Sequence, residues 1–301
     1  MKRIQFIINP SSGKQNLQDR MGILDYTLGI NDYEIIKYYT KDRESTIAKV
    51  EEAMKDESID ELAVFGGDGT VNEIVQGVYN SGKTKPIAIY PAGTVNDLAT
   101  YLKMPKDMKE FANMILRGKT QKIDLGLCND RVFANVAAAG MLTEVAINVP
   151  DEAKKNFGRL SYYAEGIREF TDHFFGDRNI AMEIDLKSKE VNYTGKAMLL
   201  IISNSASVGG FKNLVPNAHM SDGKLDVLLI KDCEMNELAN ILLNVLSGNH
   251  INMDNVIYFH SDEFEIATKN VKLIDLDGEK GTETPAKFKA LNKAVELFKA
   301  Q

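Results

Sequence analysis

The sequence contains Glu61-Leu-Ala-Val-Phe-Gly-Gly-Asp-Gly-Thr-Val-Asn-Glu73 and, shortly afterwards, Pro86-Ile-Ala-Ile-Tyr-Pro-Ala-Gly-Thr-Val-Asn-Asp97. Each segment starts with a short apolar run, passes through a turn that contains glycine, and ends with Gly-Thr-Val-Asn and an acidic residue. Apolar residues then recur at helical spacing, as Val71, Ile74 and Val78 do in the first copy. Both segments therefore predict a strand, a tight turn and the start of a helix.

These two turns suit an anion, because the first backbone N–H groups of a helix lack intrahelical partners and carry partial positive charge. The first turn is the stronger candidate, since Gly66, Gly67 and Gly69 indicate either positive φ angles or the close approach of another group to the backbone. Helix capping is the alternative, with Thr70 and Glu73 in the first copy and Thr94 and Asp97 in the second as reciprocal capping residues.

The composition is that of a globular protein with two domains. The chain has 301 residues, of which 44% are hydrophobic and 26% charged, so it has ample apolar residues for a core and disorder is not expected. The net charge of −7 argues against a broad nucleic-acid surface. Cys128 and Cys233 form no CxxC motif, which favours a reducing, cytoplasmic location. No apolar run approaches the ~18 residues needed to span a bilayer.

The first part of the chain alternates strands and helices. We expect strands at residues 2–8 and 33–39 and helices near 16–28 and 43–55, ahead of the two glycine turns. This order predicts a parallel α/β sheet covered by helices. A third polar turn, Asn9-Pro-Ser-Ser-Gly13, follows the first strand, so all three turns should meet at the carboxyl edge of one sheet, where open α/β folds bind ligands.

Past about residue 125 the pattern changes to short, mostly alternating strands. We expect a helical stretch at 152–174, a helix at 234–246, and otherwise a mainly antiparallel β-sandwich or flattened barrel. The expected strands are residues 120–127, 132–138, 180–186, 197–203, 225–230, 255–260, 263–267, 271–276 and 286–290. The predicted domains are residues 1–125 and 126–301, with a ligand site between them.

Acidic residues at the predicted sheet edge suit a divalent cation. Asp68 lies in the first glycine turn, Asp97 begins the second helix and Asp124 ends a strand, so their carboxylates can bind Mg²⁺ directly or through water. Taken singly, each is more commonly a turn residue that bonds the backbone. No Walker A or GxSxG motif is present, so a bound nucleotide would be held by another loop design.

Two Asp-Gly segments in the second half have two interpretations each. Asp277-Gly-Glu279 follows an apolar run and is either a hairpin turn or a pair of carboxylates of which one accepts a hydroxyl proton during phosphoryl transfer. His219-Met-Ser-Asp-Gly-Lys224 is either a turn or a loop that binds a cation through one carboxylate and main-chain carbonyls. Spacing alone favours a turn for the second segment.

Together these motifs resemble the diacylglycerol kinase catalytic family, which includes bacterial soluble lipid kinases and, more distantly, sphingosine kinases. Asn9 to Gly13, Gly66 to Glu73 and Pro91 to Asp97 are similar to its three nucleotide loops. Other residues recur in the family's order and spacing, namely Asn204, Gly209-Gly210, Pro216, Asp222-Gly223-Lys-Leu-Asp226 and Asp277-Gly-Glu279. Two positions depart from the pattern, Leu98 where many members have an aromatic residue and His219 where some have Lys.

The resemblance implies an α/β nucleotide-binding domain, like that of phosphofructokinases and NAD kinases, joined to a mainly antiparallel β-sandwich domain with ATP in the cleft. It implies ATP contacts by Asn9, Pro10, Ser11, Ser12, Gly13, Thr40, Gly66, Gly67, Asp68, Gly69, Thr70, Val71, Asn72, Glu73, Gly93, Thr94, Asn96 and Asp97. It implies a Mg²⁺ network through Asp68, Asp97 and Asp124, and a second, structural Mg²⁺ in a loop that aligns with His219, Asp222 and Lys224. The general base would be Asp277, with Glu279 as the alternative assignment.

The function that the resemblance implies is transfer of the ATP γ-phosphoryl group to a hydroxyl of a membrane lipid, diacylglycerol or a related lipid, in phospholipid biosynthesis. Such an enzyme would work peripherally at the inner face of the membrane. Lys154, Lys155 and Arg159 around Phe157 suit anionic headgroups, although a solvated helix face is the commoner explanation. The alternatives are a soluble-substrate kinase of the NAD kinase type and a non-catalytic nucleotide- or lipid-binding regulator. The oligomeric state stays open, with a homodimer as one alternative.

Overall fold

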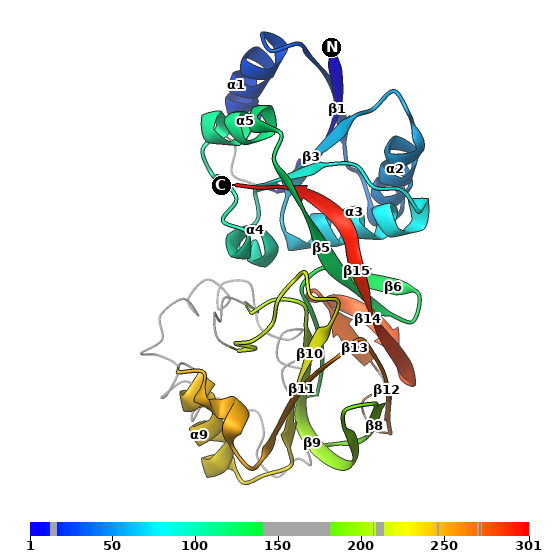
Figure 1. Cartoon of the computed structure of the whole chain (residues 1–301), viewed down its shortest axis with the longest axis vertical. Coiled ribbons are helices and arrows are strands. Elements are labelled where there is room, and N and C mark those ends of the chain that lie inside the picture. The colour runs from blue at the N-terminus through cyan, green and yellow to red at the C-terminus, as the bar shows by residue number, and fades with distance from the viewer. Residues whose placement is uncertain are drawn as a thin grey trace.

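The chain folds into two lobes that are joined by two long strands, β5 (Thr120–Cys128) and β15 (Ala286–Phe298) (Figure 1). The structure is a computed structural model, and it describes residues 1–12, 17–140, 181–206, 208, 214–245, 247–269, 271 and 273–300. The first lobe holds the elements from β1 to α5, and the second lobe holds those from β6 to β14.

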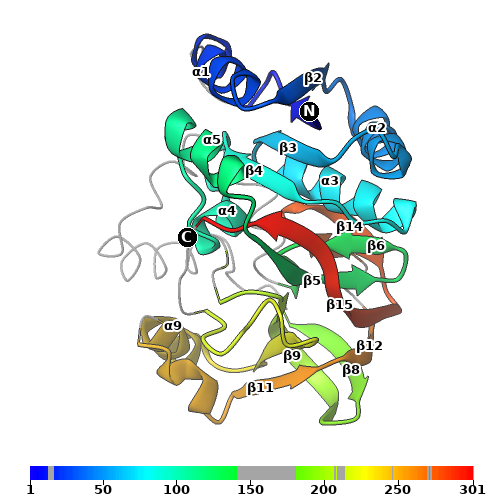
Figure 2. The same ribbon diagram turned by 45° about the horizontal axis from the view of Figure 1, so that its top comes forward.

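The first lobe is a parallel sheet with helices on both faces, as the sequence predicts. Its strands run in the order β2-β1-β3-β4. Helices α1 and α5 pack together on one face, and α2 and α3 pack together on the other (Figure 2). The elements are β1 (Lys2–Ile8), α1 (Leu17–Gly29), β2 (Tyr33–Tyr39), α2 (Arg43–Lys55), β3 (Glu61–Gly66), α3 (Asp68–Ser81), β4 (Ile87–Pro91), α4 (Asp97–Tyr101) and α5 (Met108–Arg117).

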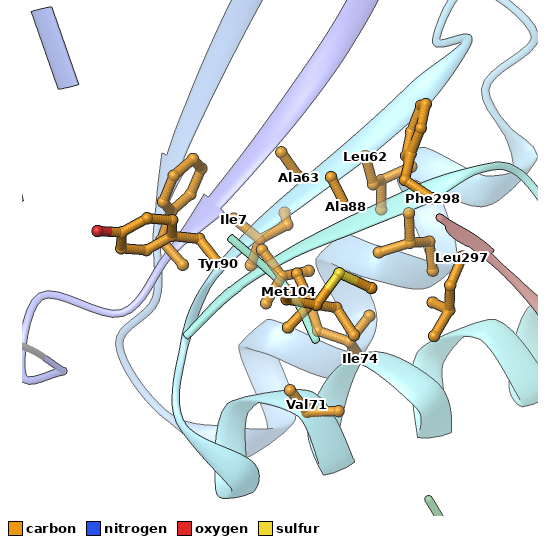
Figure 3. Packing of buried hydrophobic residues seen from close by; sticks show 14 of the residues in the cluster. Ile7, Leu62, Ala63, Val71, Ile74, Ala88, Tyr90, Met104, Leu297 and Phe298 are labelled. Atoms are coloured by element: carbon orange, nitrogen blue, oxygen red, sulfur yellow. The ribbon is translucent and has the colours of Figure 1, made fainter. Parts of the chain in front are cut away.

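The core of this lobe lies between the sheet and its helices. Strand β3 is buried at every position, which is expected where helices cover both faces of a parallel sheet. Figure 3 shows part of this buried cluster, with Leu62 of β3, Ala88 of β4, Ile74 of α3, and Leu297 and Phe298 of the last strand. The C-terminal end of the chain therefore helps to form the core of the N-terminal lobe.

The second lobe is antiparallel, as predicted, and its strands pair in the order β14-β13-β7-β9-β8-β12. Strand β10 lies on β9 and carries β11 on its other edge. The elements are β6 (Arg131–Phe133), β7 (Val136–Gly140), β8 (Met182–Ser188), β9 (Asn192–Ser203), β10 (Leu225–Lys231), α9 (Met235–Val245), the 3₁₀ turn Asn249–Asn252, β11 (Val256–Ser261), β12 (Glu263–Thr268), β13 (Leu273–Leu276) and β14 (Glu279–Glu283). The described residues of this lobe form buried apolar clusters of their own.

Strand β15 is longer than predicted and belongs to both lobes. The sequence indicates a strand at residues 286–290, but the strand continues to Phe298 because Val295, Leu297 and Phe298 are buried. It pairs with β12 in the second lobe, with β5 along most of its length, and with β4 of the first lobe at Leu297. The predicted boundary between residues 125 and 126 falls inside β5, so the chain crosses between the lobes there and returns through β15.

One further predicted element differs from the structure, and another lies outside the described residues. Residues 132–138 were expected to form one strand, but they form β6 and β7, separated by Ala134 and Asn135. The predicted helix at 152–174, with Lys154, Lys155, Phe157 and Arg159, lies outside the described residues. Within the described part of the chain, no helix is long and apolar enough to span a bilayer.

Replacing Phe288 of β15 should destabilise the fold strongly. The ring is fully buried and stacks on Phe264, with ring centroids 5.1 Å apart, so Phe288→Ala leaves a cavity beside the joining strands. We expect urea titration to show a loss of about 3–5 kcal/mol in the free energy of unfolding. Tyr26→Ala is the control, since that side chain is 70% exposed and should change stability by less than about 0.5 kcal/mol. Equal stability of the two variants would contradict the packing described.

Candidate active site

The two glycine turns touch each other through their backbones. A Cβ added to Gly93 would lie 2.5 Å from the Cα of Gly67 and 2.9 Å from Oδ1 of Asn96. These distances are shorter than side-chain carbons tolerate, so glycine is needed here for the close approach of the turns. The repeated motif therefore builds one structure from its two copies.

The two copies differ in conformation although their sequences agree. Helix α3 begins at Asp68 with Gly67 at its N-cap, so its Gly-Thr-Val-Asn lies inside the helix. Helix α4 begins only at Asp97, with Asn96 at its N-cap in the left-handed region at φ 55°. Neither Thr70 nor Thr94 is at a capping position, so the capping alternative is wrong for both copies. The Asn96 side chain instead closes its own turn by accepting from the Gly93 amide at 2.8 Å and donating to the Gly93 carbonyl at 2.7 Å.

Asp68 joins the first turn to the second. Its two carboxylate oxygens accept from the backbone amides of Asn96 and Asp97, each at 2.8 Å. Burial raises the pKa of Asp68, and the neighbouring charge of Asp97 raises it further, while the two amides act in the opposite direction. An added positive charge beside this pair would relieve the repulsion between the two carboxylates.

The predicted turn at Asn9 lies against the start of α3. Asn9 donates from Nδ2 to Oγ1 of Thr70 at 2.9 Å, and its Oδ1 accepts from the Ser11 amide at 2.9 Å. The Ser12 amide donates to the Asn9 carbonyl, and the Thr40 amide donates to Ile8 at the end of β1. Residues 9–12, Thr40 and both glycine turns therefore lie at the carboxyl ends of the parallel strands, whereas Gly13 lies outside the described residues.

The side chains of two residues in the first copy are buried inside the protein. Val71 is buried among the core residues, so only its backbone is available to a ligand (Figure 3). Asn72 is fully buried and faces the second lobe, where its Nδ2 donates to Oδ2 of Asp277 at 2.9 Å. The Asn72 side chain is therefore a link between the lobes.

The carboxylate of Asp277 accepts four hydrogen bonds. Oδ1 accepts from the Asn135 and Val136 amides, and Oδ2 accepts from the Ala134 amide and from Asn72, all at 2.7–2.9 Å. These three amides lie between β6 and β7 or at the start of β7. The predicted single strand at 132–138 is therefore interrupted where its amides donate to the Asp277 carboxylate. A carboxylate has about four acceptor positions, and all are used here.

Glu279 has a different environment two residues later. Its Oε2 forms an ion pair with Nη1 of Arg43 from the first lobe, and its Oε1 lies 2.9 Å from where a Cβ on Gly69 would be. Glu279 is therefore held across the junction between the lobes and faces the first glycine turn. Glu73, one helical turn from Gly69, has its pKa raised chiefly by burial and also by the charge of Glu279.

The third predicted metal ligand, Asp124, belongs to a different group of contacts. Its oxygens accept from the amides of Gly223 and Lys293, both at 2.6 Å, which ties the His219–Lys224 loop to β15. In that loop Asp222 accepts from the Lys224 amide at 3.0 Å and the His219 carbonyl accepts from the Ser221 amide. Among the residues that the structure describes, no group of three or more His, Cys, Asp and Glu side chains is arranged to hold a metal ion.

Sequence reasoning missed two charged residues at the junction. Arg43 begins α2, and its sequence position carries no motif that would single it out. Asp275 lies in β13 two residues before Asp277, and its Oδ1 accepts from the Gly278 amide of the same corner at 2.7 Å. Burial is the main cause that raises the pKa of Asp275 to about 6, and the charges of Asp277 and Glu279 raise it further. The hydrogen bond from the Gly278 amide acts in the opposite direction.

Gly93→Ala should separate the two glycine turns. The new methyl group would meet the Gly67 backbone, which cannot rotate away as a flexible side chain would. We expect nucleotide affinity, measured by titration with a fluorescent ATP analogue, to fall by about tenfold or more, which corresponds to ~1.4 kcal/mol. Gly22→Ala on α1 is the control, because nothing lies within 4 Å of its added Cβ. Equal affinities in the two variants would show that the contact between the turns does not matter for binding.

Asp275 should make stability depend on pH between about 4 and about 6. Its pKa is raised from 3.8 to about 6 in the folded state, so the unfolded chain releases this proton first as pH rises. The contribution of Asp275 to stability therefore falls across that window and is lowest above it. We expect urea titrations to show that Asp275→Asn gains stability relative to the wild type as pH rises from about 4 to about 6. Asp254→Asn, at an exposed position, should show no such gain, and a flat difference for Asp275→Asn would contradict the assignment.

Comparisons with known proteins cover nearly the whole chain. Residues 3–128 match the family model of the diacylglycerol kinase catalytic domain, and residues 135–299 match that of the YegS C-terminal NAD kinase beta sandwich-like domain. The chain is 30% identical over 297 residues to proteins named diacylglycerol kinase from Staphylococcus epidermidis and Staphylococcus aureus, covering 99% of this chain and 92% of each relative. The crystal structure of a diacylglycerol kinase from Bacillus anthracis shares the fold, with a TM-score of 0.80, 23% identity, and coverage of 99% of this chain and 97% of the other.

Proposed function

The chain belongs to the diacylglycerol kinase family, a family of lipid kinases, and from this premise we propose that it transfers the γ-phosphoryl group of ATP to a hydroxyl of a membrane lipid. The acceptor we propose is diacylglycerol or a closely related lipid. The enzyme would take it from the surface of the inner face of the membrane, in phospholipid biosynthesis. The observation that carries this proposal is the position of Glu279, a carboxylate of the second lobe, against Gly69 in the glycine turn of the first.

ATP would be held by the first lobe. The amides at the start of α3 have no intrahelical partners, and this helix of 14 residues directs the positive end of its dipole toward the glycine turn. Asn9 to Gly13, Thr40, Gly66 to Glu73, Gly93, Thr94, Asn96 and Asp97 remain the proposed nucleotide contacts, with Val71 and Asn72 contributing only their backbones. The Asn9 turn and the second glycine turn flank this helix start, which supports the proposal.

Mg²⁺ would offset negative charge on the phosphates. Asp68 and Asp97 suit such an ion, because burial and then the charge of Asp97 raise the pKa of Asp68, and a cation would relieve the repulsion between the two carboxylates. Both oxygens of Asp124 bind backbone amides of the His219–Lys224 loop and β15, as both oxygens of Asp68 bind those of Asn96 and Asp97, so each carboxylate would bind an ion through its remaining lone pairs. We propose that this loop, through main-chain oxygens of His219 and Lys224 and the Asp222 carboxylate, is a second Mg²⁺ site.

The proton of the acceptor hydroxyl would pass to the Asp277-Gly-Glu279 corner. A general base needs a free lone pair within reach of the substrate. The sequence favoured Asp277, but the four acceptor positions of its carboxylate are already engaged. Glu279 faces the glycine turn through Oε1, so we propose Glu279 as the proton acceptor and Asp277 as the residue that holds the corner in shape.

Replacing Glu279 should therefore remove turnover and spare ATP binding. We expect Glu279→Gln to lower kcat by about 100-fold or more, as loss of a general base does, with nucleotide affinity within about twofold of the wild type. Asp277→Asn should also lose turnover, but with a lower melting temperature, because an amide cannot accept all four hydrogen bonds. Full turnover in Glu279→Gln, with loss in Asp277→Asn at unchanged stability, would reverse the assignment.

A soluble-substrate kinase is the second candidate, because the second half matches a domain described as NAD kinase-like. An ATP-consumption assay with diacylglycerol, other lipid alcohols and NAD in parallel separates the candidates. Turnover that depends on a lipid supports the proposed function. Turnover that depends on NAD would replace it, and ATP binding without turnover on any acceptor would indicate a regulator.

A further inference from the structure

Arg43 belongs to the first lobe but reaches the proposed base in the second. It is the first residue of α2, and Asp42 before it caps the helix by accepting from the Ser45 amide at 2.8 Å. The helix start is therefore fixed in the first lobe. From there the guanidinium extends to the β13–β14 corner, where it meets Glu279.

The guanidinium divides its donors between two partners. Nη1 pairs with Oε2 of Glu279, while Nη2 donates to Oδ1 of Asn72 at 2.9 Å. An amide side chain has one oxygen, so holding that oxygen decides which way Asn72 faces. Its Nδ2 is then directed to Asp277 at 2.9 Å and to the Val132 carbonyl at 3.3 Å.

We infer that Arg43 is a positioning residue for phosphoryl transfer, setting the Glu279 carboxylate against the glycine turn and fixing the Asn72 amide on Asp277. This inference rests on the proposed function of the same site. Arg43 acts through Glu279 and Asn72 and is assigned no contact with the substrate. The series Arg43–Asn72–Asp277 and the pair Arg43–Glu279 thus connect the nucleotide lobe to both acids of the corner.

The charges around Arg43 agree with this role. Glu73 lies on the second turn of α3 and Glu279 faces the start of that helix, and the charge of Glu279 adds to the burial that raises the pKa of Glu73. The positive charge of Arg43 acts in the opposite direction on Glu73. Arg43 therefore allows two carboxylates to lie close together beside the turn that is proposed to receive phosphate.

The two contacts require an arginine. A guanidinium presents several N–H groups in a rigid plane, whereas a lysine ammonium is a single flexible point charge. The side chains of Arg43 and Glu279 remain 28% and 35% exposed, and ion pairs with this much exposure contribute little to stability. The effect of losing Arg43 should therefore appear in the rate of transfer rather than in folding.

The test compares Arg43→Gln and Arg43→Lys with Arg3→Gln. Arg3 is a matched control, because it forms an ion pair with Glu34 and a hydrogen bond with Ser58. The side chains of Arg3 and Glu34 are 34% and 42% exposed, similar to the Arg43–Glu279 pair, but Arg3 lies at the opposite end of β1 from the site. We expect kcat to fall about 10- to 100-fold in both Arg43 variants, because a small displacement of a reacting group lowers the rate by about this much. The KM for ATP should stay within about threefold, and Arg3→Gln should retain wild-type kcat.

A double variant tests whether Arg43 acts through Glu279. If it does, Arg43→Gln should lower kcat by a smaller factor in the Glu279→Gln background than in the wild type, because only the part that acts through Asn72 remains, whereas independent effects would multiply in full. Multiplying effects would overturn the inference, as would wild-type kcat in Arg43→Gln. A fall in kcat accompanied by a drop in melting temperature much larger than that of Arg3→Gln would also overturn it, because the role would then be structural.

The same assay separates this inference from the proposed function. A wild-type enzyme with lipid-dependent turnover and a fully active Arg43→Gln would overturn the inference alone. A wild-type enzyme that transfers phosphate to no lipid would overturn both.

Discussion

The carboxylate of Asp277 is the contact on which the junction between the lobes depends. Three backbone amides of residues 134–136 and the side chain of Asn72 converge on its two oxygens. Leaving any of these buried donors without a partner would cost about 1–3 kcal/mol. These hydrogen bonds interrupt the strand between β6 and β7 and fix the β13–β14 corner to β7. Through Asn72 they also hold α3 of the first lobe against the second lobe. Glu279 is placed beside the glycine turn because the corner that carries it is fixed in this way.

The first lobe brings its own parts together by a different constraint, which is the approach of two backbones. Gly67 and Gly93 meet where no side chain fits, and the Asp68 carboxylate then bonds the amides of the second turn. These contacts join the carboxyl ends of β3 and β4 into one surface of amides and carboxylates. A phosphate with its cation is the kind of ligand that such a surface suits. The two lobes are connected through β15, which contributes buried residues to both.

Much of this fold could be predicted from the sequence, because β1, β3 and β4 are apolar runs that are almost entirely buried and helices α3 and α5 each bury an apolar face. Helix α2 and strand β2 have the predicted bounds, and α3 follows the first glycine turn as expected. Local pattern could not reveal contacts between distant residues. The last eight residues of β15 alternate weakly, and they are a strand because β5 and β4 pair with them. The start of α4 depends on the left-handed backbone of Asn96, which the identical Gly-Thr-Val-Asn of the first copy does not adopt.

For the candidate site too, local sequence pattern identified the motifs but not the contacts between distant residues. Its turns and acids were found in the sequence, but which acid is free to accept a proton depends on donors from residues 134–136 and Asn72, which sequence spacing does not show. The central claim is that a nucleotide bound at the first turn faces Glu279 across the junction. A crystal structure with a non-hydrolysable ATP analogue tests it most directly. The account predicts the γ-phosphate beside the amides of Gly67 to Gly69 with Glu279 opposite, and a triphosphate bound away from that turn would contradict it.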